Sequence, residues 1–120
     1  MSEVISVANI LSLKAKHGLK FAPGAISSDS QKGLACARGV LAIEAFGGIE
    51  NLISSYRLGR RGIYSPEVPK HFGIPMREID ALELGFLSDD NEPNTHFNAT
   101  AGERAAFDVG YQLRDYITPA

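Results

Sequence analysis

Cys36 is the only cysteine in this 120-residue chain and its strongest nucleophile. A catalytic thiol needs a base within hydrogen-bond reach, and His71 or His96 could supply one if the fold brought it close. The local sequence favours a structural role instead, because Cys36 shares an apolar stripe with Val40 and Ile43 about two turns into an expected helix. We therefore predict no catalytic residues and keep a cysteine-dependent hydrolase as an alternative.

Arginines beside tyrosines can clamp phosphates or carboxylates and can stack on planar groups. The segment YRLGRRGIY, residues 56–64, places three arginines between two tyrosines. A solvated helix C-terminus is the competing interpretation, because cations there complement the helix dipole. His96 joins the candidates because it lies in a polar segment. The candidate binding residues are Arg57, Arg60, Arg61, Tyr64, Lys70, Arg77 and His96.

Metal and cofactor sites lack their usual sequence patterns. His17, His71 and His96 are far apart and do not show the spacing of metal ligands. The glycines of GLACARG, residues 33–39, match no phosphate-binding fingerprint and instead suit close helix packing. We predict neither a metal nor a cofactor.

Residues 65–86, SPEVPKHFGIPMREIDALELGF, predict two short helices that bend around Gly73. Apolar residues follow at the offsets that two packed helices require: Val68, Phe72, Ile74, Ile79 and Leu82. On this spacing, residues 50–86 resemble the phage-repressor class of helix-turn-helix proteins. The resemblance implies a second helix that reads base edges in the major groove.

The side chains of that second helix are poorly suited to DNA. Six of its positions are expected to be exposed: Met76, Arg77, Glu78, Asp80, Ala81 and Glu83. Three of these six are carboxylates, which would face the phosphates of DNA. If Ser65 is the N-cap of the first helix, Pro69 removes an N–H from the first intrahelical bonds and strains that helix. The sequence therefore favours the shape of a helix-turn-helix over its usual function.

The order of features along the whole chain is similar to that of a group of small uncharacterised bacterial and phage proteins. The similar features are His17-Gly18, a Cys-x-x-Gly-x-Leu helix at residues 36–41, Phe72-Gly73, and Phe97-Asn98 before a last helix. Val40 and Ala99 depart from the pattern of that group, which has alanine and aspartate there. The resemblance implies a bacterial or phage origin and no activity.

Helical periodicity and capping residues predict a single all-α domain over residues 1–120, a compact bundle of five to six helices. The last helix opens with a capping box, Thr100 to Glu103. No alternating strand pattern is present, and residues 87–99 predict a mobile connection. Helices are expected over residues 3–17, from a cap at 28–30 to 46, and over 49–56, 65–72, 75–84 and 100–117.

Composition limits the function classes. Apolar residues make up 44% of the chain and charged residues 22%, and the net charge of −2 gives no general attraction to nucleic acid or anionic membranes. The last third is acidic. No signal peptide or bilayer-spanning run is recognised, and the single cysteine excludes an intrachain disulfide, so we expect a cytoplasmic protein.

These observations favour a small non-enzymatic protein that binds another macromolecule, most simply a protein. The basic segment 56–64 and the acidic last third would form a two-sided electrostatic surface. A DNA-binding transcriptional regulator is the first alternative, and the cysteine-dependent hydrolase is the second. A second copy of the chain is a further candidate partner, whereas a membrane is not.

Overall fold

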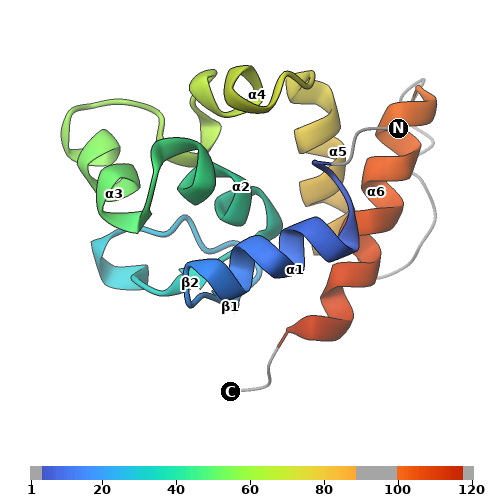
Figure 1. Ribbon diagram of the computed structural model, residues 1–120, viewed down its shortest axis with the longest axis horizontal. Coiled ribbons are helices and arrows are strands. Elements are labelled where there is room, and N and C mark those ends of the chain that lie inside the picture. Colours follow the sequence, from blue (N-terminus) through green and yellow to red (C-terminus); the bar gives the residue numbers. More distant parts are fainter. Residues whose placement is uncertain (1–3, 89–99, 118–120) are drawn as a thin grey trace.

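The computed structural model describes residues 4–88 and 100–117. These residues form six α-helices, three short 3₁₀ turns and one pair of two-residue strands (Figure 1). The predicted all-α bundle of five to six helices is confirmed. The helices are α1 (Val7–Lys16), α2 (Ala37–Phe46), α3 (Ile49–Arg57), α4 (Glu67–Phe72), α5 (Met76–Leu87) and α6 (Ala101–Leu113). The strands are β1 (Lys20–Phe21) and β2 (Leu34–Ala35), and the 3₁₀ turns are η1 (Asp29–Gln31), η2 (Gly62–Tyr64) and η3 (Arg114–Tyr116).

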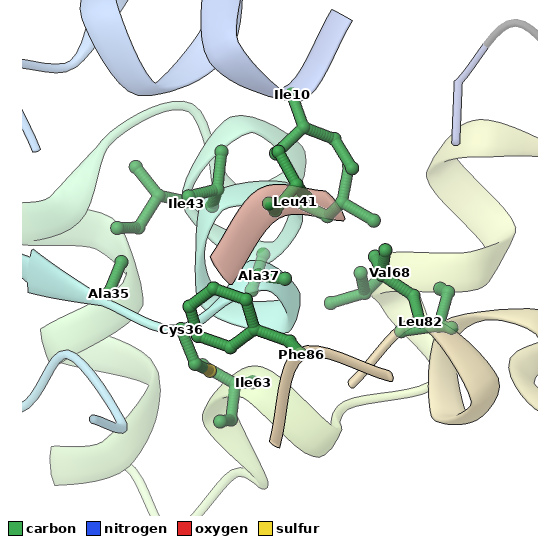
Figure 2. Packing of buried hydrophobic residues seen from close by; sticks show 14 of the residues in the cluster. Ile10, Ala35, Cys36, Ala37, Leu41, Ile43, Ile63, Val68, Leu82 and Phe86 are labelled. Carbon is green, nitrogen blue, oxygen red and sulfur yellow. The ribbon is translucent and has the colours of Figure 1, made fainter. Parts of the chain in front are cut away.

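Helix α2 lies at the centre of the bundle, where α1, α3, α4 and α5 all pack against it. Its residues from Ala37 to Ile43 are all buried. Figure 2 shows how Leu41 of α2 lies among side chains from other helices, including Ile10, Val68 and Phe86. Because neighbours surround α2 on several sides, small and apolar side chains are needed around most of its circumference.

Helix α2 begins later than predicted. The caps expected at residues 28–30 instead lead into the 3₁₀ turn η1, and Gly33 then adopts a left-handed φ of 88°. Helix α2 starts only at Ala37, with Cys36 as its N-cap. The prediction that Cys36 lies two turns into the helix is therefore wrong, although its burial is confirmed.

The strands β1 and β2 were also not predicted. They pair in parallel, with Lys20 opposite Leu34 and Phe21 opposite Ala35. Phe21 and Ala35 are buried, while Lys20 and Leu34 are exposed. A strand of two residues is too short to show a period of two, so the sequence pattern could not predict it.

Side-chain caps fix the beginnings of two helices. At α6 the predicted Thr100 N-cap is confirmed, because the Glu103 N–H donates to Thr100 Oγ1 at 3.1 Å; the Glu103 carboxylate accepts from this hydroxyl and not from the Thr100 backbone N–H of a full capping box. Helix α1 begins at Val7, after the expected start near residue 3. There the Asn9 N–H donates to the hydroxyl of the N-cap Ser6.

Helices α5 and α6 run side by side in the same direction, with their first turns adjacent (Figure 1). Two glycines allow this close approach. A Cβ on Gly110 would lie 2.0 Å from the carbonyl oxygen of Leu82, and a Cβ on Gly85 would lie 2.0 Å from that of Phe107. Any larger residue at either position would therefore separate the helices.

The connection expected over residues 87–99 lies almost wholly outside the described residues. Leu87 itself is the last residue of α5. In the part of the chain that is described, no helix combines the length and apolar character needed to cross a bilayer.

Candidate functional site

Residues 57–64, which begin at the last residue of α3, form an ordered turn that we call the basic turn. The Gly59 N–H donates to the Tyr56 carbonyl and the Arg60 N–H donates to the Ser55 carbonyl, so both of these carbonyls in the last turn of α3 are satisfied. Gly59 is left-handed, with φ at 74°, as the predicted end of this helix requires. The last three residues of the turn form η2.

The side chain of Tyr56 packs against the basic turn. Its hydroxyl donates to the Ile26 carbonyl and accepts from the Ile63 N–H at 3.3 Å. Gly62 lies directly over this ring, because a Cβ there would approach the Tyr56 Cε1 to 2.0 Å. Burial raises the pKa of the Tyr56 phenol above its ordinary value, which favours the O–H form that this donor requires. The turn is therefore held in one conformation.

Two arginines of the basic turn are already paired. Arg57 Nη2 lies 2.7 Å from Asp29 Oδ1, and Arg60 Nη1 lies 3.5 Å from Glu67 Oε1 on α4. Arg61 is exposed and forms no ion pair with another described residue. The positive charge of the turn is thus smaller than the sequence suggests and centres on Arg61.

Apolar surface accompanies this charge. Leu58 is 72% exposed, more than any other large hydrophobic residue in the described part of the chain, and Tyr64 is 53% exposed. Lys70 on α4 is also exposed and has no ion-pair partner among the described residues. Arg60 ties the basic turn to α4, so Lys70 belongs to an element that adjoins the turn.

The structure does not bring all the predicted binding residues together. Arg77 lies on α5, where its Nε is 3.7 Å from Glu103 Oε1 of α6. His96 lies outside the described residues. The predicted set therefore reduces to the basic turn, with Lys70 beside it.

The two helices predicted over residues 65–86 are present as α4 and α5, and Gly73 between them is left-handed, with φ at 67°. The strain predicted at Pro69 is absent. Helix α4 has Pro66 rather than Ser65 as its N-cap, so Pro69 is its third residue. The first four N–H groups of a helix have no intrahelical acceptor, and proline loses nothing there.

Helix α5 exposes less of its surface than predicted. Ala81 is buried, and Met76, Glu78 and Glu83 are partly buried, because α2 and α6 both pack against this helix. Of the six positions that were expected to face a ligand, only Arg77 and Asp80 are exposed.

Arg38, near the start of α2, is a polar centre that the sequence analysis missed. This residue is only 4% exposed, and its Nη2 forms an ion pair with Asp80 of α5. Its guanidinium lies 4.9 Å from the centre of the Tyr64 ring, while its backbone N–H donates to Glu83 at 3.2 Å. The carboxylates of α5 therefore bind α2. The sequence feature that could have identified this centre is a single arginine inside the apolar run of residues 33–43.

The thiol of Cys36 is enclosed by this arrangement. Its sulfur accepts a hydrogen bond from the Gly39 N–H at 3.3 Å, as an N-cap does. Burial first, and then the negative charge of Glu83, raise the pKa of the thiol well above its ordinary value. A helix N-terminus that would favour a thiolate is thus outweighed by burial and a neighbouring carboxylate.

No three potential ligands from histidine, cysteine, aspartate and glutamate lie close enough to hold a metal ion within residues 4–88 and 100–117. Comparison with protein-family models, curated proteins and solved structures gives no significant match to this chain. The two resemblances drawn from the sequence therefore stay predictions, and the function must be argued from the geometry alone.

Proposed function

We propose that this chain is a small non-enzymatic binding protein of the cytoplasm that contacts another protein through the basic turn. The observation that carries the proposal is the exposure of Leu58 and Tyr64 beside Arg61, which has no ion-pair partner among the described residues, on a turn that Tyr56 holds in place. Arginine and tyrosine are enriched where proteins bind each other.

The chemistry of the turn defines the partner. Burial of the Leu58 side chain against an apolar group would contribute roughly 1.5–3 kcal/mol. The Arg61 guanidinium fits a carboxylate, and Lys70 adds a second cation nearby. A partner segment with an apolar side chain flanked by acidic residues would satisfy all three. Because the turn is already ordered, little conformational entropy is lost when it binds.

A DNA-binding regulator remains the alternative, and the surroundings of α5 weigh against it. A reading helix must enter the major groove with one face free. Helix α6 packs along α5, and the exposed Asp80 would meet phosphate. The hydrolase alternative is weakened by the burial of Cys36 and the raised pKa of its thiol.

Affinity capture from an extract of the native host, with a variant of the turn beside the wild type, tests the proposal. The double variant Leu58→Ser/Arg61→Glu changes two exposed side chains and should fold normally, which circular dichroism would check. We expect it to lose specific protein partners that the wild type retains. Lys20→Glu, a matched charge reversal at an exposed position on β1, should retain them. Identical partner sets for all three proteins would refute the proposal.

Fluorescence anisotropy with a random-sequence duplex at low salt tests the DNA alternative. We expect no saturable binding. An affinity that falls steeply with salt and is weakened by Arg61→Ala would instead support the regulator.

A further inference from the structure

A pocket of about 480 Å³ lies where the N-terminal segment, the turn after α4 and the first turns of α5 and α6 meet. It is large enough to hold a side chain of a partner. Its walls are almost entirely apolar or backbone, and Glu78 is the single charged residue that lines it. The lining residues are Ile5, Gly73, Ile74, Pro75, Glu78, Ala101, Gly102, Ala105 and Ala106.

The carboxylate of Glu78 has no hydrogen-bond or ion-pair partner among the described residues. The nearest cation on the same helix, Arg77, is directed to Glu103 at 3.7 Å, so the charge of Glu78 is not neutralised locally. Gly102 makes room for this carboxylate, because a Cβ there would lie 2.6 Å from Glu78 Oε2. The N-termini of α5 and α6 offset this charge only in part, because they carry partial charges.

An apolar pocket with one unpaired carboxylate is complementary to a hydrocarbon chain that ends in a cation. A lysine side chain has this form, since its stem is four methylene groups and its head is an ammonium ion. A metal ion is a poorer fit, because hard cations take several oxygen ligands. We infer that the pocket, with Glu78, binds a lysine side chain of a partner protein.

This inference rests on the proposed function, because it assumes a protein partner. The basic turn precedes α4, whereas residues just after α4 line the pocket, so the two sites lie at opposite ends of this helix. One partner could therefore place an acidic segment on the basic turn and a lysine in the pocket.

Titration of ¹⁵N-labelled protein with a short capped peptide that contains one lysine tests the inference. We expect saturable amide shifts at Gly73, Ala101 and Gly102, which line the pocket. The same peptide with Nε-acetyl-lysine, which lacks the charge, should bind about ten-fold more weakly or not at all. Shifts spread over the surface without saturation, or equal binding of the two peptides, would overturn the inference.

Two variants separate a specific site from general attraction to an acidic protein. Glu78→Gln should weaken binding about ten-fold, whereas Glu50→Gln, the same change at an exposed carboxylate on α3, should not. Gly102→Ala should fold normally and also weaken binding, because its Cβ displaces only the end of the Glu78 side chain. Wild-type affinity in both Glu78→Gln and Gly102→Ala would exclude the site.

The outcome can be read independently of the proposed function. The Leu58→Ser/Arg61→Glu variant should bind the lysine peptide as the wild type does, because neither residue lines the pocket. If the peptide fails to bind while the turn variant still loses its partners, the pocket inference alone is wrong. If the peptide binds and the turn variant keeps its partners, the basic turn is wrong and the pocket stands.

Discussion

Arg38 and Glu44 show how the position of a charged residue in one helix decides its role. Both belong to α2, but Arg38 is buried, stacked on Tyr64 and paired with α5, whereas Glu44 lies near the surface end of the helix. A buried ion pair of this kind gives weak evidence for net stability, since desolvation offsets the attraction. What Arg38 contributes clearly is the alignment of α2 with α5.

Glu44 gives a pH-dependent prediction at the residue scale. Lys16 Nζ lies 2.9 Å from its carboxylate, and His17 Nε2 donates to the same oxygen at 2.9 Å. These hydrogen bonds, from Lys16 first and then His17, lower the pKa of Glu44 in the folded protein. Its stabilisation is therefore present above the unfolded pKa of about 4.3 and is lost as the pH falls through the lower folded value.

We expect Glu44→Gln to lower the free energy of unfolding by about 0.5 kcal/mol near pH 7, because solvent screens a pair near the surface. The difference from wild type should vanish once the pH falls below the lowered pKa of Glu44 in the folded protein. Urea unfolding at a series of pH values would measure it. A difference that stayed constant from neutral to acidic pH would contradict the assignment.

At the scale of elements, the contact between α5 and α6 depends on backbone meeting backbone. Gly85 and Gly110 each lie against a carbonyl of the other helix, so their lack of a side chain sets the separation of the two helices. One side of α5 is therefore covered by α6. The helix is built into the bundle along its length.

Gly110→Ala should destabilise the protein by at least about 2 kcal/mol, because its Cβ would meet the backbone of Leu82 and Phe86, which cannot rotate away. Gly102→Ala is the matched control in the same helix, since its Cβ meets only the flexible end of Glu78. Alanine also favours helix over glycine, so this control should be as stable as wild type or more so. Thermal unfolding followed by circular dichroism would compare them, and equal losses would refute the packing argument.

At the scale of the whole molecule, one hydrophobic cluster includes residues from α1, α2, α3, α4, α5 and α6. No helix of this bundle buries its apolar face without the others. Polar contacts also join the helices: Arg38 and Glu83 connect α2 to α5, and Arg77 connects α5 to α6.

We therefore expect a single cooperative unfolding transition for the whole chain. The chain has four tyrosines and no tryptophan, so tyrosine fluorescence reports tertiary packing while far-ultraviolet circular dichroism reports the helices. In urea the two signals should share one midpoint. Two separate midpoints would mean that the bundle consists of independently stable parts.

Much of the fold could be predicted from local features. Helical spacing of apolar residues, the glycines that end α2, α3 and α4, and the Thr100 N-cap all act within a few residues of sequence, and the structure confirms them. The basic turn was likewise visible in the sequence as a run of arginines between tyrosines.

Tertiary structure alone decided the rest, because those features depend on residues far apart in the chain. Pairing with Phe21 holds Ala35 in a strand, so α2 has its N-cap at Cys36 and not at residues 28–30. Asp29 and Glu67 reduce the charge of the basic turn, and α6 closes the pocket around Glu78. The sequence determined which helices form, although α5 runs on to Leu87 and α6 ends at Leu113, against expected ends at residues 84 and 117. Long-range packing determined which of their polar side chains remain available to bind.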